Sequence, residues 1–308
     1  MRRVVTLMST YNGEKYLDEQ IRSIMDQQGV DVKLLVRDDG SSDGTLTHLA
    51  RWREEEPDRI EVIEDKNIGF AASFSRLIKE GLSRYPDAEI FAFADQDDVW
   101  LSDKLERGVK AIEGKEAEYS GRPIAYASNT MLVDSELKEI GLRWQCGDID
   151  ITRSRGLVEN FATGCTMLFN RVAAEIYDRT YRTGLKVHDF RMYQIALFAG
   201  CFIWDKESRI LYRQHSGNQI GSQPFWGRMK TRLLKQRYKE HTLEKQNRAF
   251  LRDCGNELDP ESIALIERFC EYRKNLKTRL QLLTNREIRY SRRESDFFYR
   301  LKVLMGTV

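Results

Sequence analysis

The first hundred residues alternate between short apolar runs and longer amphipathic stretches. The apolar runs Val4 to Met8, Val32 to Val36, Ile60 to Ile63 and Phe91 to Ala94 have the length of buried strands. Between them, apolar residues recur every three or four positions, which is the spacing of helices that cover a sheet. Strands that alternate with helices predict an α/β fold with a single, doubly wound, mostly parallel sheet and right-handed crossovers.

Each of these four strands is followed by a polar cluster. The clusters are Ser-Thr-Tyr-Asn-Gly at 9–13, Asp-Asp-Gly-Ser-Ser-Asp-Gly-Thr at 38–45, Asn-Ile-Gly at 67–69 and Asp-Gln-Asp-Asp at 95–98. Ligands of open parallel sheets bind beyond the carboxyl ends of the strands, so the four clusters should converge on one crevice. The alternative for residues 38–45 is an ordinary helix cap with turn residues.

The last cluster places Asp95, Asp97 and Asp98 within four residues. Crowded carboxylates repel one another unless a cation lies between them, which predicts a divalent metal, Mg or Mn, held by oxygen ligands. A solvated acidic turn is the alternative. The glycine patterns of dinucleotide sites and P-loops are absent, so a phosphate ligand here would need the metal as its positive partner.

The next hundred residues give less regular signals. Residues 123–127 and 131–133 are expected to pair as two strands around Ser128 and Asn129. Gly-Cys-Thr at 164–166 interrupts a strand, either to leave room for a ligand or as a β-bulge. His188 and Asp189 precede a helical run, where an Asp is also a common cap.

Beyond residue 222 helical spacing dominates, which predicts a domain at 1–222 and a helical extension at 223–308. Residues 226–308 carry 20 Lys and Arg against 11 Asp and Glu, a balance of +9, and the preceding 225 residues balance to −7. A basic tail with clustered aromatics, at Arg289 to Leu304, suits an anionic membrane surface. Packing on the first domain and a homodimer interface are the alternatives, and no nucleic-acid-binding motif accompanies the charge.

No apolar run approaches the ~20 residues of a membrane span, and no signal peptide opens the chain. The sequence therefore predicts a cytoplasmic protein, peripheral on the inner face of the cell membrane if its tail binds lipid. Its five cysteines include no Cys-x-x-Cys pair, which favours reduced thiols.

The order of the four clusters resembles the family 2 inverting glycosyltransferases, which have the A-type nucleotide-sugar fold. The resemblance continues in Ala-Thr-Gly-Cys-Thr-Met at 162–167, His-Asp at 188–189 and Tyr-Arg-Gln-His-Ser-Gly-Asn at 212–218, so that it covers roughly residues 1–220. The variants Asn-Ile-Gly-Phe and Tyr-Arg-Gln-His are most similar to the bacterial rhamnosyltransferase branch.

The resemblance implies a metal-dependent enzyme that moves a sugar from a nucleoside-diphosphate sugar to a saccharide or lipid-linked saccharide, in bacterial cell-surface polysaccharide synthesis. It points first to dTDP-L-rhamnose as donor and next to UDP-hexoses. It makes Asp189 the general base, although Phe190 stands where the family often has Trp. The metal ligands would be Asp97 and His215.

The remaining roles that we expect fall into two groups. The donor would contact Thr10, Tyr11, Asn12, Asp38, Asp39, Asn67, Gly69, Asp95, Gln96 and Arg213. The acceptor would contact Trp100, Gly164, Cys165 and His188.

Two other hypotheses fit the sheet. A sugar-1-phosphate nucleotidylyltransferase would need a glycine-rich, basic loop after the first strand, which residues 9–15 do not supply. A non-catalytic nucleotide-sugar or glycan-binding scaffold would not need Asp97, Asp189 and His215 together.

Overall fold

The computed structural model describes residues 1–144, 149–182, 188–214 and 242–308. The chain forms two compact units, one of residues 1–147 and 162–214 and the other of residues 148–161 and 215–308. The expected domain boundary after residue 222 lies outside the described residues and stays a prediction.

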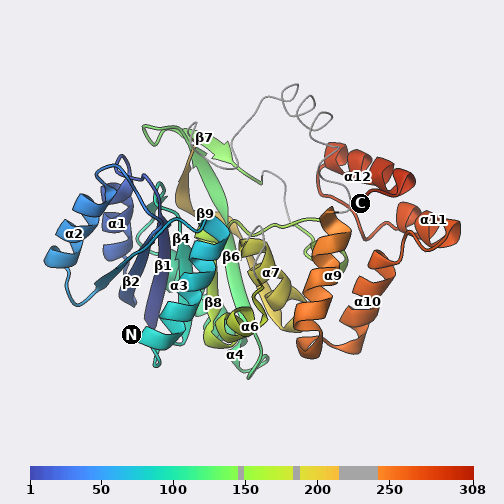
Figure 1. Cartoon of the computed structure of the whole chain (residues 1–308), viewed down its shortest axis with the longest axis horizontal. Coiled ribbons are helices and arrows are strands. Elements are labelled where there is room, and N and C mark those ends of the chain that lie inside the picture. Colours follow the sequence, from blue (N-terminus) through green and yellow to red (C-terminus); the bar gives the residue numbers. More distant parts are fainter. Residues whose placement is uncertain (145–148, 183–187, 215–241) are drawn as a thin grey trace. The chain divides into compact units, whose positions relative to one another are not determined.

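The first unit is a sheet with helices (Figure 1). Its strands are β1 (Arg3–Thr10), β2 (Asp31–Asp38), β3 (Ile60–Glu64), β4 (Ile90–Ala94), β5 (Val99–Trp100), β6 (Ile124–Val133), β7 (Glu139–Leu142), β8 (Leu168–Asn170) and β9 (Cys201–Arg213). Its helices are α1 (Leu17–Met25), α2 (Thr45–Glu55), α3 (Phe70–Arg84), α4 (Lys104–Glu116), the 3-10 turn η1 (Gly164–Thr166), α6 (Arg171–Thr180) and α7 (His188–Ala199).

Within the described residues the sheet has the strand order β3-β2-β1-β4-β8-β6-β9-β5, and β7 pairs with β6. The four strands that the sequence predicts, β1 to β4, are mutually parallel. The joins of β8 to β4 and to β6 are antiparallel, whereas β6 and β9 run parallel. The predicted α/β fold with a mostly parallel sheet is confirmed.

The alternation of side chains along β1 explains why helices cover both faces. Val4 and Met8 belong to the cluster that packs α1, α2 and α4 against one face. Leu7 faces the other way, where Gly81 of α3 approaches it closely. On that same face Phe74 of α3 meets Phe93 of β4 edge to face, with ring centroids 5.2 Å apart. The sheet is therefore buried on both sides.

The register of the parallel strands brings the predicted polar clusters together. Thr10, the last residue of β1, pairs with Asp38, the last residue of β2. On the other side, Met8 pairs with Ala94, so the Asp95 turn begins where β1 ends. The predicted convergence at the carboxyl edge is thus a direct result of strand pairing.

The structure corrects two details of the middle of the chain. Residues 124–133 form one continuous strand and not a hairpin. The polar side chain of Asn129 does not start a turn, because it donates hydrogen bonds to the carbonyl groups of Trp144 and Lys206, which are distant in sequence. Ser128 and Asn129 lie where the register of β6 with β9 shifts. Residues 164–166 form a 3-10 turn and not a β-bulge.

The described second unit is helical. It contains α5 (Arg153–Gly156), α9 (Thr242–Cys254), η3 (Gly255–Glu257), α10 (Pro260–Cys270), α11 (Leu276–Thr284) and α12 (Arg293–Met305). Helix α10 begins at Pro260, with Asp259 as cap accepting from the backbone N–H of Ser262 at 2.7 Å. The side chain of Asn247 on α9 donates to the carbonyl oxygen of Leu157 at 2.8 Å, which ties the segment before residue 162 to this unit.

Two further observations concern the described residues as a whole. Cys165, Cys201, Cys254 and Cys270 are free thiols, in line with the expectation from their spacing. None of the helices that the structure describes combines the length and the apolar character needed to cross a bilayer.

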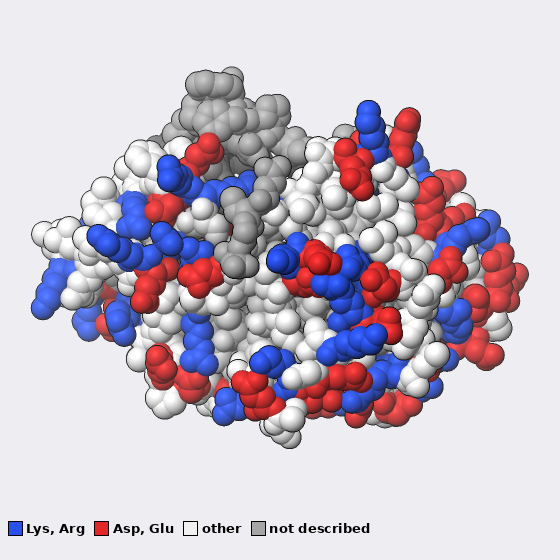
Figure 2. All heavy atoms as spheres, turned by 180° about the vertical axis from the view of Figure 1, so that it is seen from behind, with Lys and Arg blue, Asp and Glu red and all other residues white. Residues whose placement is uncertain are grey.

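Acidic and basic side chains are interspersed over the face of the molecule shown in Figure 2. Neither sign of charge forms a single broad patch there.

Candidate active site

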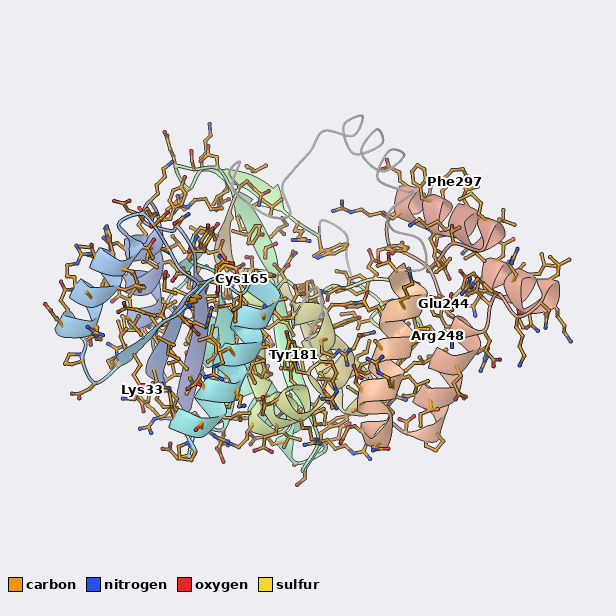
Figure 3. All side chains as sticks on the ribbon, viewed as in Figure 1. Lys33, Cys165, Tyr181, Glu244, Arg248 and Phe297 are labelled. Carbon is orange, nitrogen blue, oxygen red and sulfur yellow. The ribbon has the colours of Figure 1, made fainter. Side chains whose placement is uncertain are left out.

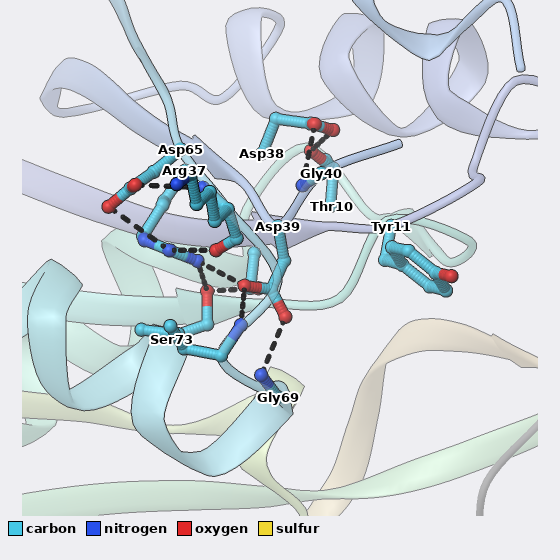
Figure 4. Close-up of polar contacts among 12 residues, drawn as sticks. Thr10, Tyr11, Arg37, Asp38, Asp39, Gly40, Asp65, Gly69 and Ser73 are labelled. Atoms are coloured by element: carbon cyan, nitrogen blue, oxygen red, sulfur yellow. Dashed lines mark hydrogen bonds and ion pairs between the residues drawn. The ribbon is translucent and has the colours of Figure 1, made fainter. Parts of the chain in front are cut away.

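Asp38 closes the end of β2 onto β1. Its carboxylate accepts from the hydroxyl groups of Thr10 at 2.9 Å and Ser41 at 2.6 Å and from the backbone N–H groups of Gly40 and Ser41 (Figure 4). Gly40 has a φ of 80°, a conformation that favours glycine. The side chains of Asp38 and Thr10 are buried, so this pair fixes the shape of the loop that follows.

Asp39 belongs to a second buried network. It accepts from the Arg37 guanidinium, which is itself fully buried and also donates to Ser73 on α3 (Figure 4). The Asp39 carboxylate further accepts from the backbone N–H groups of Ile68 at 2.8 Å and Gly69 at 2.9 Å. Asp39 thereby holds the loop before α3, and Gly69, with a φ of 85°, begins that helix. Asn67 beside it is exposed.

Gln96 joins the Asp95–Asp98 turn to the loop after β1. Its side-chain amide pairs in both directions with the backbone of Tyr11, at 2.8 and 3.1 Å. Any side chain at Gly13 would meet that amide, since an added Cβ would lie 2.4 Å from its Oε1. Asn12 accepts from the backbone N–H of Ser42 at 2.8 Å. The Tyr11 side chain is left 51% exposed at the mouth of this loop.

The carboxylates of the turn lie in a buried, like-charged environment. Burial and the neighbouring charges of Asp97 and Asp189 raise the pKa of Asp95 to about 7. Burial and the charges of Asp97 and Asp95 raise the pKa of Asp98 well above its usual range. One Asp98 oxygen accepts from the backbone N–H of Arg213, whereas Oδ2 has no hydrogen-bond partner.

Cys165 completes a group that could hold a cation. Ligand atoms of Asp95, Asp98 and Cys165 lie within 4.8 Å of one another. Burial and the charges of Asp98 and Asp95 raise the pKa of the Cys165 thiol well above its usual range, so the thiol is protonated at neutral pH. The orphaned Asp98 oxygen and the mutual repulsion of the carboxylates fit a bound divalent ion.

A buried lysine lies behind this group. Lys104, the first residue of α4, is 1% exposed, and its Nζ lies 3.5 Å from the ring centroid of Trp100 with no hydrogen-bond partner. Burial lowers the pKa of Lys104 to about 7, against the charges of Cys165 and Asp98. Lys104 is the cation that faces the carboxylates from α4.

Asp189 begins α7 and faces the same region. Burial raises its pKa to about 6, against the opposing effects of backbone N–H groups, including those of Phe190 and Gly164, and of the Arg143 charge. Its Oδ1 is buried without a hydrogen-bond partner. A carboxylate with a pKa near neutrality and a free oxygen is suited to accept a proton. The raised pKa of Asp95 shows that the two carboxyl groups interact.

Gly164 touches both residues of the His-Asp pair. An added Cβ at Gly164 would lie 3.0 Å from Nε2 of His188 and 3.4 Å from Cβ of Asp189. The turn η1 thus carries Cys165 toward the Asp95 turn while Gly164 packs against α7. His188 is 1% exposed, and burial lowers its pKa to about 3, so its ring is neutral.

Trp100 and Arg213 are among the predicted contacts that lie in the protein interior. Trp100 is 3% exposed and packs in the core cluster beneath Lys104, so a sugar could reach it only if this packing opened. Arg213 is 2% exposed and donates to the carbonyl oxygens of Asp97 and Ser135 and to the Glu19 carboxylate. Through these contacts Arg213 stabilises the Asp95–Asp98 turn. This structural role does not require a contact with a diphosphate.

The predicted metal ligand His215 lies outside the described residues, and its role stays a prediction. Asp97, the other predicted ligand, is partly exposed like Asp95, whereas Asp98 is buried, and the charge of Asp97 acts on both of these carboxyl groups. The described residues therefore bring together the donor-side loops, the acidic turn, η1 and Asp189.

Sequence reasoning missed the buried cations Arg37 and Lys104. The signal available for Arg37 was a charged residue within an apolar run, immediately before Asp38 and Asp39. For Lys104 no local signal existed, because a lysine at a helix start is ordinarily exposed.

Comparison with known families decides what kind of protein carries this site. Residues 6–177, more than half of the chain, match glycosyl transferase family 2. The chain belongs to this family. It is a nucleotide-sugar glycosyltransferase, as the order of its motifs predicts.

Several relatives resemble this glycosyltransferase. The dTDP-rhamnosyl transferase RfbG of Shigella flexneri is 29% identical over 229 residues, which are 70% of this chain and 74% of that protein. The Escherichia coli enzyme WfgD, a UDP-Glc:alpha-D-GlcNAc-diphosphoundecaprenol beta-1,3-glucosyltransferase, is 30% identical over 109 residues, 36% of this chain and 40% of that one.

Solved structures confirm the fold of the glycosyltransferase. The S. aureus TarS 1-349 structure in complex with UDP is similar with a TM-score of 0.53 at 15% identity, and the match covers 93% of this chain and 76% of that chain. The Pyrobaculum calidifontis mannosyltransferase PcManGT, in complex with GDP-Man and Mn2+, gives a TM-score of 0.50 at 17% identity, over 99% of this chain and 88% of that one.

Proposed function

We propose that this glycosyltransferase inverts the sugar's anomeric configuration in a single displacement, with Asp189 as general base. The observation that carries the proposal is the Asp189 carboxyl group, which has a pKa of about 6 and a buried oxygen without a partner, and interacts with Asp95 of the acidic turn. An acceptor hydroxyl needs such a group, because its proton must leave as its oxygen attacks.

In this reaction the acceptor oxygen forms a bond to the anomeric carbon while the bond from that carbon to the diphosphate breaks. The acceptor proton passes to Asp189, and the nucleoside diphosphate leaves with the bonding electrons. Asp189 is oriented for this step by the backbone N–H of Gly164 and by its place at the start of α7. No covalent enzyme intermediate forms, so the protonated Cys165 thiol is not a nucleophile.

The acidic turn would hold a divalent cation, Mg2+ or Mn2+. Asp98 supplies a buried carboxylate, Asp95 and Asp97 add partly exposed ones, and His215 is the proposed ligand from the residues that follow β9. When bound, the cation would neutralise charge that develops on the leaving diphosphate. The orphaned Asp98 oxygen and the raised pKa of Asp95 support this assignment.

For the donor we propose dTDP-L-rhamnose. The support is the 29% identity with a dTDP-rhamnosyl transferase over 70% of this chain. The loops of Thr10, Tyr11, Asn12 and Asp38 would enclose the nucleotide. Oδ2 of Asp39 accepts one hydrogen bond among the described residues, from Gly69, and would accept a second from the base imide N–H. A UDP-hexose is the second candidate, favoured by the likeness to a UDP-Glc-dependent enzyme.

For the acceptor we propose a saccharide, free or lipid-linked, in bacterial cell-surface polysaccharide synthesis. The name of the WfgD enzyme, which states a diphosphoundecaprenol-linked sugar as its acceptor, supports this class of substrate. Gly164 packs directly beside Asp189, so the Gly-Cys-Thr turn that we expect at the acceptor lies next to the proposed base.

The test combines binding and turnover. Thermal unfolding is measured with dTDP, UDP and GDP and their sugars, each with and without Mn2+; a ligand at about 100 times its Kd adds about 2.7 kcal/mol of stability. We expect a metal-dependent shift with dTDP compounds. Asp189→Asn should keep that shift and lose transfer, and the anomeric configuration of the product, read by NMR, should be inverted.

Other outcomes would redirect the proposal. A shift with UDP compounds alone would replace the donor and leave the chemistry. Near-normal transfer by Asp189→Asn would remove Asp189 as the base. Binding without any hydrolysis or transfer in the wild type, over a panel of acceptors, would favour the scaffold hypothesis.

A further inference from the structure

The two last helices carry an unusual share of the exposed apolar surface. Among the described residues, eleven large apolar side chains are exposed, and six of them lie on α11 and α12. These six form what we name the exposed apolar face: Leu276, Leu280, Phe297, Leu301, Leu304 and Met305. Single exposed apolar residues are ordinary, whereas a cluster indicates a contact surface.

The cluster follows from the helical phase of α12. Positions 297, 301, 304 and 305 share one side of a helix, and Phe297, labelled in Figure 3, is 66% exposed. The opposite side is buried by Tyr299, at 2% exposure, and Val303, at 0%. Core packing within the second unit therefore already uses one side of α12, and the apolar residues of the other side remain outside.

Helix α11 adds to the same surface. Leu276 and Leu280 are one helical turn apart, with exposures of 68% and 47%. The guanidinium of Arg279, the neighbour of Leu280, lies 3.5 Å from the backbone oxygen of Leu304 on α12. Helices α11 and α12 are thus neighbours within the second unit.

The stretch of chain that carries this face is positively charged. Residues 273–308 contain ten Lys and Arg against three Asp and Glu, a balance of +7. Of the three acids, Asp296 is paired with Arg300, and Glu287 and Glu294 are the others. No ion pair within the described part of the chain involves Lys277, Arg286, Arg289 or Arg293.

We propose that the exposed apolar face of α11 and α12 docks on an anionic lipid bilayer. Apolar side chains would enter the boundary between headgroups and acyl chains, and the flanking basic residues would contact lipid phosphates. A second copy of the chain is the competing occupant. A symmetric contact would place two surfaces of +7 opposite each other, which charge repulsion disfavours.

The experiment is co-sedimentation of the full chain with phosphatidylcholine vesicles and with vesicles that contain phosphatidylglycerol as well. We expect binding to the anionic vesicles only, weakened by added salt. The double variant Phe297→Ser/Leu304→Ser should bind at least about tenfold more weakly. The matched control is Ile140→Ser, which alters a 62% exposed apolar residue of the first unit and should bind as the wild type does.

A second variant, Lys277→Gln/Arg293→Gln, keeps the apolar residues and should bind several-fold more weakly, with a shallower dependence on salt. Thermal unfolding checks that each variant is folded. Equal binding of all variants, or no binding of the wild type to anionic vesicles, would overturn the proposal. Loss of a dimer in sedimentation velocity, without vesicle binding by the wild type, would assign the face to self-association. Transfer to a water-soluble acceptor should be unchanged in every variant, so this test is independent of the proposed function.

Discussion

The imidazole of His188 stacks on the ring of Phe74, with ring centroids 3.9 Å apart and planes inclined by 11°. Phe70 and Phe93 meet the same imidazole edge to face, at 4.8 and 4.7 Å. Both ring nitrogens are buried without hydrogen-bond partners. The residue before Asp189 is therefore held in an aromatic box between α3 and β4, and the box fixes the start of α7.

This box should make the protein sensitive to acid. Burial lowers the pKa of His188 to about 3, so below pH 6.5 the unfolded chain binds a proton that the folded chain does not. The stability gained from the neutral ring is complete above pH 6.5 and is lost progressively toward pH 3. At pH 5 the loss is about 2 kcal/mol.

His188→Phe removes this titration. Its free energy of unfolding, measured with urea at pH 7 and pH 5, should fall less on acidification than that of the wild type, whatever constant cost the larger ring adds. The same difference between variant and wild type at both pH values would contradict the neutral, buried histidine.

The rate of transfer should fall in acid because the base must be deprotonated. Burial raises the pKa of Asp189 to about 6. The pH profile of kcat/KM should therefore have an acid limb that begins at or below pH 6, along which the value falls tenfold for each pH unit. Asp189→Asn should lower kcat by about a thousandfold or more and leave no such limb. A profile that is flat down to pH 4.5 would show that another group accepts the proton.

The metal-free protein should lose stability as pH rises through neutrality. The pKa of Asp95 is raised to about 7 and that of Asp98 is raised as well, so the folded state holds protons that the unfolded state has released above pH 4. The midpoint of thermal unfolding should therefore fall between about pH 6.5 and pH 8, above the range in which His188 lowers stability. Added Mn2+ should reverse that fall, with a larger stabilisation at pH 8, because ligands bind metal when deprotonated.

Asp98→Asn tests the source of this dependence. It should flatten the pH profile of the metal-free protein and weaken Mn2+ binding, read by electron paramagnetic resonance, by at least about tenfold. A variant with unchanged pH dependence and unchanged metal affinity would separate the buried carboxylate from the metal site.

Lys104 should tune the metal site through its charge. Its ammonium group interacts with the charge of Asp98 from a buried position, so it opposes a second cation there. Lys104→Met should strengthen Mn2+ binding several-fold near pH 6.5, where the lysine is largely charged, and much less at pH 8.5. Lys110→Met, on the exposed side of α4, is the control and should change neither value.

The sequence was informative where structure follows from local patterns and failed where it depends on distant partners. The strand ends that carry Thr10, Asp38 and Asp95 could be predicted, because parallel strands place their carboxyl ends at one edge. The continuity of β6 could not, since Asn129 bonds to residues 15 and 77 positions away. The burial of Trp100 and Arg213 likewise depends on contacts made only in the folded chain. Both side chains are almost fully covered, so a donor or an acceptor could contact them only if the surrounding residues moved.

The short segment at 148–161 has a consequence for how such enzymes can be recombined. It lies between two stretches of the first unit in sequence but belongs to the second, where Arg153 pairs with Asp259, Ser154 donates to Glu287 and Glu159 accepts from the backbone of Ser291. A hybrid that took only the residues after 222 from a relative would join foreign helices to a native segment with mismatched partners. Exchange of the helical unit between relatives therefore requires two more crossovers than exchange of a C-terminal tail alone would, one on either side of this segment.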